Sequence, residues 1–142
     1  MKVSQTIKLD ASADTVWAYV RDFYNAAEWQ PHMISAKKGD KDGERVVHMK
    51  RGNTVLDRIA QLDDATRTLA YEMVPDQDLP PGAPRLEGFL ATFVVTPAGD
   101  QSEVAYSIQV EVPEPIREMA EKGIGADIEG ALHGLAAKFG AA

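Results

Sequence analysis

The C-terminal part of the chain carries one long amphipathic pattern, and the part before it carries several short alternating ones. Between residues 113 and 142, apolar residues recur at spacings of three and four, which is typical of a helix with one buried face. The earlier segments alternate apolar and polar residues, which is typical of half-buried strands. A single long helix can bury its apolar face only against a sheet that curves around it. The sequence therefore predicts a curved antiparallel sheet around one helix, with a hollow between them.

The predicted helix combines an apolar ladder with four glycines. Each glycine inside a helix costs about 1 kcal/mol relative to alanine, so packing must hold this helix in place. We expect the glycines to let the helix approach the sheet closely, and the alternative is that they leave room for a ligand or permit bending. The glycines are Gly123, Gly125, Gly130 and Gly134. The ladder consists of Ile116, Ala120, Ile124, Ile128, Leu132, Leu135 and Phe139.

Turn and capping residues divide the rest of the chain into short elements. A first strand covers residues 2–9, and Ser12 can cap a helix that follows it. Asn25 is placed to open a second short helix, which Pro31 ends. The further strands are predicted at residues 33–38, 45–50, 55–62, 68–74, 86–96 and 103–112.

Composition limits the classes of function. The chain of 142 residues is long enough for one domain, residues 1–142, with a real core. Its net charge of −7 argues against nucleic acid as a partner, because that binding rests on clustered Lys and Arg. It has no apolar run of about 20 residues, so we expect no integral membrane association. Cysteine is absent and the first residues alternate like a strand rather than a signal peptide, so we expect a cytoplasmic protein.

Several segments match, in order and spacing, the pattern of one superfamily. They are residues 13–17 (ADTVW), 22–23 (DF), 29–31 (WQP), 43–49 (GERVVHM), 55–59 (VLDRI), 79–89 (LPPGAPRLEGF) and 96–100 (TPAGD). Together they resemble the helix-grip (SRPBCC) superfamily of START domains, Bet v 1 allergens, polyketide cyclases and coenzyme Q-binding proteins. The resemblance implies an α+β fold: about seven antiparallel strands, two short helices after the first strand, and a long C-terminal helix in the sheet. It does not imply one function, because enzymes and binding proteins share this fold.

The segment at residues 79–89 is similar to bacterial relatives of the plant abscisic-acid receptors, but the chain departs from those receptors. Their longer gate loop corresponds here to residues 51–53 alone, and their carboxylate-binding lysine corresponds to Pro31. Their latch is only half matched, by Arg85 and Leu86. A hormone-receptor role with a phosphatase partner is therefore not expected.

Strand parity and the resemblance point the same set of side chains into the hollow. The set is mostly apolar and carries four polar residues, which is the usual composition of a small-molecule site. The polar residues are Arg45, Asp57, Tyr71 and Tyr106. The predicted ligand-binding residues are Arg45, Val47, Met49, Asp57, Ile59, Tyr71, Met73, Leu86, Phe89, Tyr106, Ile108, Ile124, Ile128 and Leu132.

Asp57 is the candidate catalytic residue, because it interrupts an apolar face and a lone buried carboxylate is costly. Arg45 on the neighbouring strand is its natural partner. The pair either fixes the hairpin as an internal ion pair or orients a polar group of a ligand, and Asp57 could also act as a general base. The two tyrosines, Tyr71 and Tyr106, either bond a ligand or serve as core aromatics.

Other chemistry-bearing residues form no motif. His32, His48 and His133 match no zinc spacing, so we expect structural or surface roles for them, no metal site and no cofactor. The loop at residues 75–84 is long for a hairpin and is either a lid or a stiff exposed loop. The methionines at 33, 49, 73 and 119 are expected in the core.

These observations favour the binding of a small, largely apolar ligand in the hollow: an aromatic, polyketide-like or isoprenoid (lipid) compound. The first alternative is a polyketide cyclase or dehydratase that uses Asp57 or a tyrosine for proton transfer. The second is a protein-interaction module of the cochaperone type, which requires an exposed apolar patch. Monomer and homodimer both stay open.

Overall fold

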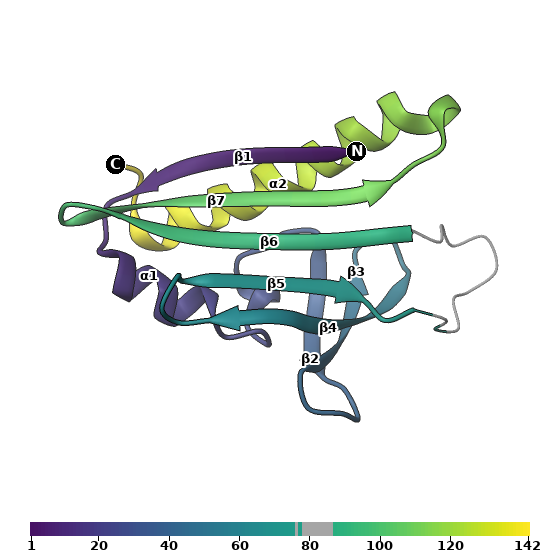
Figure 1. The fold of residues 1–142 in the computed structure, drawn as a ribbon, viewed down its shortest axis with the longest axis horizontal. Coiled ribbons are helices and arrows are strands. Elements are labelled where there is room, and N and C mark those ends of the chain that lie inside the picture. The colour runs from purple at the N-terminus through teal and green to yellow at the C-terminus, as the bar shows by residue number, and fades with distance from the viewer. Residues whose placement is uncertain (76, 78–86) are drawn as a thin grey trace.

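Seven strands form one antiparallel sheet, and a long helix lies across its concave side (Figure 1). This computed structural model describes residues 1–75, 77 and 87–142. The architecture confirms the predicted helix-grip class. Its elements are β1 (Lys2–Leu9), α1 (Ala13–Val20), the 3-10 helix η1 (Ala26–Glu28), β2 (Met33–Lys38), β3 (Glu44–Met49), β4 (Thr54–Asp63), β5 (Thr68–Met73), β6 (Glu87–Ala98), β7 (Gln101–Glu111), the 3-10 helix η2 (Glu114–Ile116) and α2 (Arg117–Phe139).

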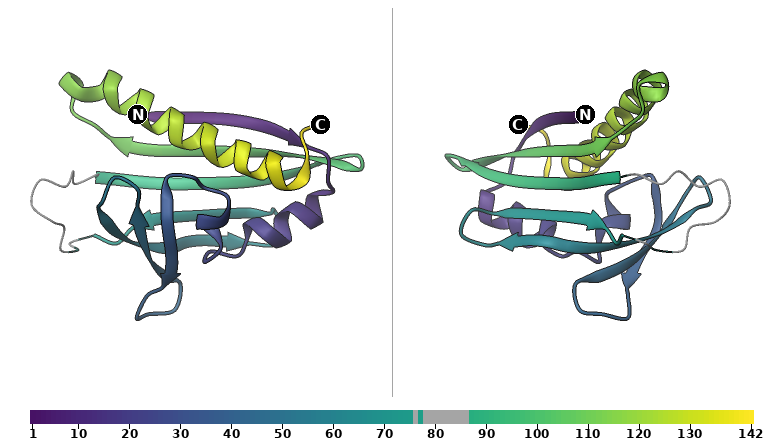
Figure 2. Two further views of the ribbon diagram at one scale, coloured as in Figure 1. Left: turned by 180° about the vertical axis from the view of Figure 1, so that it is seen from behind. Right: turned by 45° about the vertical axis from the view of Figure 1, so that its right-hand side comes forward.

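The sheet runs in the order β1-β7-β6-β5-β4-β3-β2, so all neighbours except β1 and β7 are consecutive in the chain. Register shifts interrupt the pairing of β2 with β3, of β4 with β5, and of β6 with β7. Such bulges bend a strand and increase its twist, which lets the sheet curve around the helix. The helix α2 runs along β1 and β7 (Figure 2).

The short elements after β1 differ in part from expectation. Ser12 caps α1 as predicted, since its Oγ accepts a hydrogen bond of 3.2 Å from the Thr15 amide. The predicted second helix is only the single 3-10 turn η1. Its expected cap, Asn25, uses its side chain elsewhere: Nδ2 donates to the Tyr19 carbonyl, and Oδ1 accepts from the Trp29 indole.

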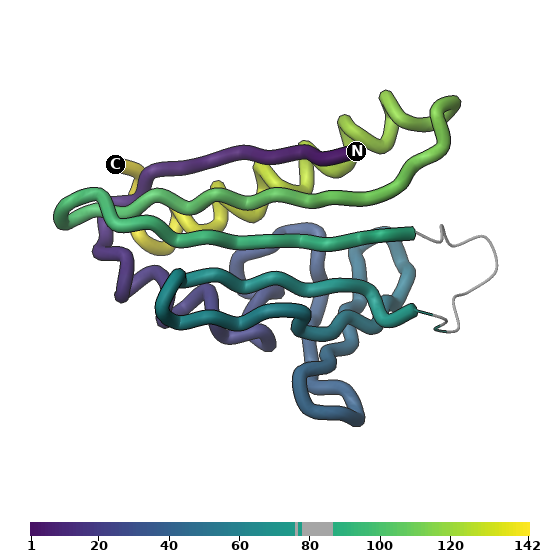
Figure 3. The backbone as a smooth tube through the Cα atoms, in the orientation of Figure 1, coloured from purple at the N-terminus to yellow at the C-terminus, as the bar shows by residue number. Residues whose placement is uncertain are grey.

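The long helix is buried over only part of its length. It begins at Arg117 rather than at residue 113, because Pro115 lies in the separate turn η2. Its buried residues are Ile128, Ala131, Leu132 and Leu135. The start of the helix projects beyond the N-terminal start of β1 (Figure 3). Met119 in this part of the helix is 71% exposed, and Ile116 in the preceding turn η2 is 46% exposed. The expectation that Met119 fills the core, and Ile116 extends the buried ladder, is therefore wrong.

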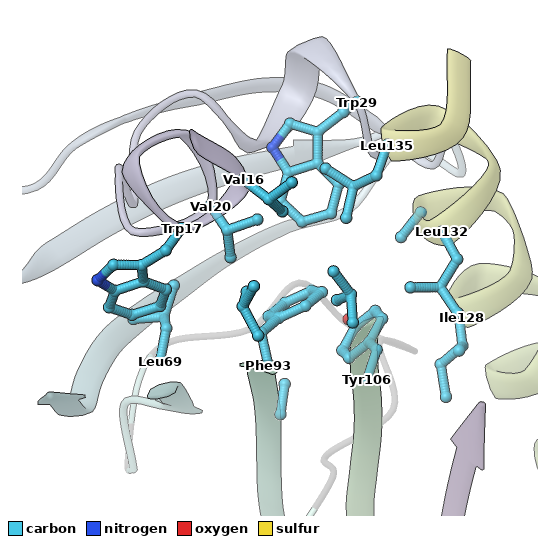
Figure 4. Packing of buried hydrophobic residues seen from close by; sticks show 14 of the residues in the cluster. Val16, Trp17, Val20, Trp29, Leu69, Phe93, Tyr106, Ile128, Leu132 and Leu135 are labelled. Carbon is cyan, nitrogen blue, oxygen red and sulfur yellow. The ribbon is translucent and has the colours of Figure 1, made fainter. Parts of the chain in front are cut away.

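One core joins α1, the sheet and α2 (Figure 4). Val16 and Val20 of α1 face the sheet, and Leu132 of α2 closes the core from the other side. Phe93 and Tyr106 stack at its centre, with their ring centroids 3.8 Å apart. The core therefore ties the helix to the end of the sheet that α1 covers.

Two of the helical glycines permit a close approach, as expected, but to a different neighbour. A Cβ atom on Gly134 would overlap the carbonyl oxygen of Trp29, and one on Gly130 would lie 2.9 Å from Cγ of Pro31. Both neighbours belong to residues 29–32, a segment between η1 and β2 that we call the strap. The helix thus packs closely on the strap, whereas the expectation was close packing on the sheet.

This packing predicts opposite effects for the same substitution at two positions of α2. Gly134→Ala should destabilise the protein by about 1–3 kcal/mol or more, because backbone must move to admit the methyl group. Gly123→Ala is the control: nothing lies within 4 Å of its Cβ position, so helix propensity should stabilise the protein by about 0.5–1 kcal/mol. Urea denaturation measures both, and equal effects at the two positions would contradict the close approach.

Candidate functional site

Four polar side chains from four strands gather on the concave side of the sheet, and we call them the polar cluster. Arg45 of β3 lies directly opposite Asp57 of β4 in the strand register. Tyr71 of β5 and Tyr106 of β7 complete the cluster, and all four are buried. Strand parity predicted that these side chains point inward, and their burial agrees with it.

The guanidinium of Arg45 holds three parts of the chain together. Its Nη1 donates a 2.8 Å hydrogen bond to the carbonyl of Phe23, and its Nη2 donates one of 3.2 Å to Oδ2 of Asp57. The group also lies over two aromatic rings, 3.9 Å from the centroid of Phe23 and 4.5 Å from that of Tyr71. Its Nε is buried and has no hydrogen-bond partner among the described residues. The predicted ion pair is thus formed, and it also fixes the segment between α1 and η1.

The pair lies deep in the protein, with Arg45 1% exposed and Asp57 3% exposed. Burial raises the pKa of the Asp57 carboxyl above its usual range, and the charge and hydrogen bond of Arg45 offset part of that rise. Removing one partner of such a pair costs far more than a surface pair would, because the other charge is left buried.

The two tyrosines form a neutral pair. Their hydroxyl oxygens are 3.1 Å apart, so one hydroxyl donates to the other. Burial raises the pKa of Tyr71, and it raises the pKa of Tyr106 well above the usual value. The pair therefore keeps both protons at neutral pH and retains one hydroxyl hydrogen that the mutual bond does not use.

The predicted apolar ligand contacts divide into two groups by exposure. Val47, Ile108, Ile128 and Leu132 are fully buried, and the last three belong to the main core. Ile59 is partly buried against the same core.

A second group keeps some accessible surface. Met49, Met73, Phe89 and Ile124 are only partly buried, and we call them the accessible wall. They lie toward the end of the sheet where β5 stops, β6 starts and α2 begins (Figure 1). Leu86 and most of the loop at residues 75–84 lie outside the described residues. That the buried residues and the accessible wall contact a ligand stays a prediction.

Two polar residues near the cluster were not predicted as site residues. His32 ends the strap, and its carbonyl accepts a 3.0 Å hydrogen bond from the Lys50 amide at the β3–β4 hairpin. Asp127 of α2 bonds Nη2 of Arg51 from the same hairpin, at 3.1 Å. Burial lowers the pKa of His32; Asp127 opposes this, while Arg51 and Arg45 lower it further. The sequence pattern that could have indicated Asp127 is its position between Ile124 and Ile128, two residues of the apolar ladder of the helix.

Two findings about the part of the chain that the structure describes concern metal ions and membranes. Within it, no group of three or more His, Asp or Glu side chains is placed to hold a metal ion. Nor is any described helix both long enough and apolar enough to cross a bilayer.

The sequence model for the family "Polyketide cyclase / dehydrase and lipid transport" matches residues 1–140. The chain belongs to this family. A search of curated proteins finds no match to this chain.

Solved structures with the fold of this cyclase and lipid-transport family resemble the chain along nearly all of it. The protein XoxI from Bacillus cereus has a TM-score of 0.84 at 20% identity, covering 97% of this chain and 94% of its own. A START superfamily protein from Mycobacterium smegmatis has a TM-score of 0.75 at 18% identity, with 97% and 96% covered. The ZhuI aromatase/cyclase from Streptomyces sp. R1128 has a TM-score of 0.74 at 19% identity, with 97% and 92% covered. At these identities the likeness supports the fold alone.

The buried pair predicts a stability loss that depends on pH. Arg45→Met removes the charge that offsets the effect of burial on Asp57, so it should cost about 3–5 kcal/mol near neutral pH. The folded-state pKa of Asp57 then rises further above its ordinary value of 3.8. A carboxyl with a raised folded-state pKa destabilises the protein as pH rises through that pKa, so the loss should shrink toward acid pH.

Urea denaturation of Arg45→Met across the range from about pH 4 to pH 8 measures this dependence. Adding Asp57→Asn should recover part of the stability at the alkaline end, because the unpaired charge is gone. Asp57→Asn alone should cost less than Arg45→Met, since Arg45 keeps the Phe23 carbonyl and two aromatic rings. A loss that is constant with pH and unrelieved in the double variant would mean that packing, not charge, causes it.

Proposed function

We propose that this protein binds one small, largely apolar molecule between its sheet and α2, of an aromatic, polyketide-like or isoprenoid (lipid) kind. The observation that carries the proposal is the accessible wall. Its four apolar side chains come from three strands and the helix and keep accessible surface: Phe89 and Ile124 pack against the main core, and Met49 and Met73 pack against a second buried cluster that includes Val47. An apolar surface with a few polar groups is the usual composition of a ligand site. The family's description, which names lipid transport beside cyclase chemistry, supports this class of ligand.

A cyclase or dehydratase activity is the second candidate. The observation in its favour is that Asp57 is a buried carboxyl in the polar cluster and that burial raises its pKa above the ordinary value, as is common for catalytic carboxyls. Tyr106 would be an alternative proton donor. Binding is preferred because Asp57 is hydrogen-bonded to an arginine that also anchors the segment after α1, which is a structural role.

A protein-interaction module gains no specific support. Such a module requires a contiguous exposed apolar patch. Among the described residues, Ile34 of β2 and Leu62 of β4 are exposed on different strands, and Ile116 and Met119 are exposed at the projecting start of α2. Exposed apolar residues in such small numbers are normal on a protein surface.

Filling the accessible wall should abolish binding. Ile124→Trp places a large ring among the partly exposed apolar side chains, so it should reduce the affinity for the dye 1-anilinonaphthalene-8-sulfonate at least about tenfold. Met119→Trp is the matched control, because Met119 lies on the same helix but is exposed. Fluorescence titration gives both affinities, and native mass spectrometry of the parent, purified from its own cells, weighs any retained compound. Unchanged dye binding in Ile124→Trp would place the ligand elsewhere.

A variant of Asp57 separates binding from catalysis. We expect the parent to leave both the mass and the chromatographic retention time of a retained compound unchanged on prolonged incubation, since a binding protein makes no product and a cyclised isomer would differ in retention. We also expect Asp57→Asn to alter stability without altering which compound co-purifies. Suppose instead that the parent converts the compound, and an equally stable Asp57→Asn binds it but converts it about 10²–10⁴ times more slowly. The cyclase-type function would then replace the binding function.

A further inference from the structure

Tyr71 is the member of the polar cluster that lies beside partly exposed apolar side chains. In the strand register Ile59 of β4 is directly opposite it, and Met73 lies two residues further along β5 on the same face. The ring centroids of Tyr71 and Phe89 are 6.4 Å apart. Ile59, Met73 and Phe89 all keep some accessible surface, whereas Tyr71 is buried. A molecule that lies on these apolar side chains therefore has Tyr71 as a polar neighbour.

The two tyrosines of the polar cluster hold one more hydrogen atom than their mutual bond uses. Their hydroxyl oxygens are 3.1 Å apart, and either hydroxyl can donate to the other. Two hydroxyl groups carry two hydrogens, so one hydrogen is left over whichever group donates. Tyr106 stacks on Phe93 inside the core, with the ring centroids 3.8 Å apart. Tyr71, through its contact with Phe89, is the member of the pair that adjoins the accessible wall.

Arg45 places a second unused donor beside Tyr71. Its guanidinium lies 4.5 Å from the centroid of the Tyr71 ring, and its Nε is buried without a hydrogen-bond partner among the described residues. Its other two nitrogens already donate, one to the Phe23 carbonyl and one to Oδ2 of Asp57. A buried donor without an acceptor is costly. The side chains around Tyr71 thus leave two donors for a hydrogen-bond acceptor.

Charge and hydrogen count select the kind of acceptor. Arg45 and Asp57 already balance each other, so an anion would bring an unpaired buried charge. A carbonyl oxygen is neutral, has two lone pairs and carries no hydrogen, so it can accept from one donor or from both. Burial raises the pKa of Tyr71, so its hydroxyl keeps its proton near pH 7 and can donate. A hydrocarbon group accepts from neither donor.

We propose that the hydroxyl of Tyr71 forms a subsite for a carbonyl oxygen, so that this protein selects apolar ligands with a ketone, quinone or ester carbonyl over hydrocarbons of the same shape. This inference rests on the proposed binding function and names the ligand's polar group. The ligand's apolar body lies on Met73 and Phe89, and Tyr71 donates to its oxygen while Tyr106 donates to Tyr71. Selection follows because a ligand without the oxygen leaves the buried donors unsatisfied.

Two probes of nearly the same shape test the subsite: 2-acetylnaphthalene and 2-isopropenylnaphthalene, in which a methylene group replaces the carbonyl oxygen. Displacement of the dye 1-anilinonaphthalene-8-sulfonate near pH 7 gives the affinity of each probe. The ratio of the two affinities should fall about three- to tenfold from the parent to Tyr71→Phe, the effect of one hydrogen bond. Comparing ratios cancels the difference in hydrophobicity between the probes.

Tyr19→Phe is the matched control for the loss of one hydroxyl. Its ring packs on Trp29 and Phe139 rather than on the accessible wall, so the ratio should equal that of the parent. Infrared spectroscopy of the bound ketone adds a readout that altered packing alone does not produce, because a hydrogen bond lowers the stretching frequency of a carbonyl. The isotope-labelled carbonyl should absorb at lower frequency in the parent than in hexane, and should return toward the hexane value in Tyr71→Phe.

The outcomes separate this inference from the proposed function. Equal ratios in the parent and Tyr71→Phe would overturn the subsite and leave apolar binding intact. Binding of neither probe would overturn both proposals. A lowered carbonyl frequency that persists in Tyr71→Phe would assign the carbonyl to another donor and would also overturn the subsite. If urea denaturation shows that Tyr71→Phe does not fold, the parent decides alone, since a hexane-like frequency in the parent contradicts a hydrogen bond.

Discussion

The buried guanidinium of Arg45 is the interaction on which the arrangement of this protein most depends. It bonds the carboxylate on the next strand and the backbone carbonyl of Phe23, and two aromatic rings cover it. The hairpin of β3 and β4 and the segment after α1 are therefore positioned by one charge. Burying that charge costs desolvation free energy, which the ion pair, the hydrogen bonds and the ring contacts offset only while all of them are formed.

The concave side of the sheet consists of two different regions. Toward α1 it is filled by stacked rings and by the buried residues of α2, so it contributes stability rather than a binding surface. Toward the start of β6 it keeps apolar side chains that are partly accessible. The polar cluster is joined to the filled region, since Tyr106 stacks on Phe93 and its hydroxyl bonds that of Tyr71. A fold of this kind separates the residues that hold it together from those that are free to specify a ligand.

Period-two alternation was sufficient to predict the inward face of the sheet, because one buried face fixes the register of a strand. Arg45 and Asp57 could thus be paired from the sequence alone, and the register confirms it. Alternation carries no information about irregular segments, which explains why the close packing of the helix on the strap was missed. Helical periodicity likewise predicted the ladder but not its end: Ile116 continues the spacing, although it is exposed. Which partner a helix face meets is a tertiary property.

The uneven burial of α2 gives its two halves different local stability. From Ile128 onward the helix is held by the core and by the strap, whereas no residue from Arg117 to Gly123 is buried. Two glycines, Gly123 and Gly125, stand at the boundary and weaken the helix there. Fraying of the first turns therefore breaks few tertiary contacts, and its free energy is a small fraction of that of global unfolding. The start of α2 borders the accessible wall, so exchange of a bound molecule with solvent can proceed through local unfolding while the core stays folded.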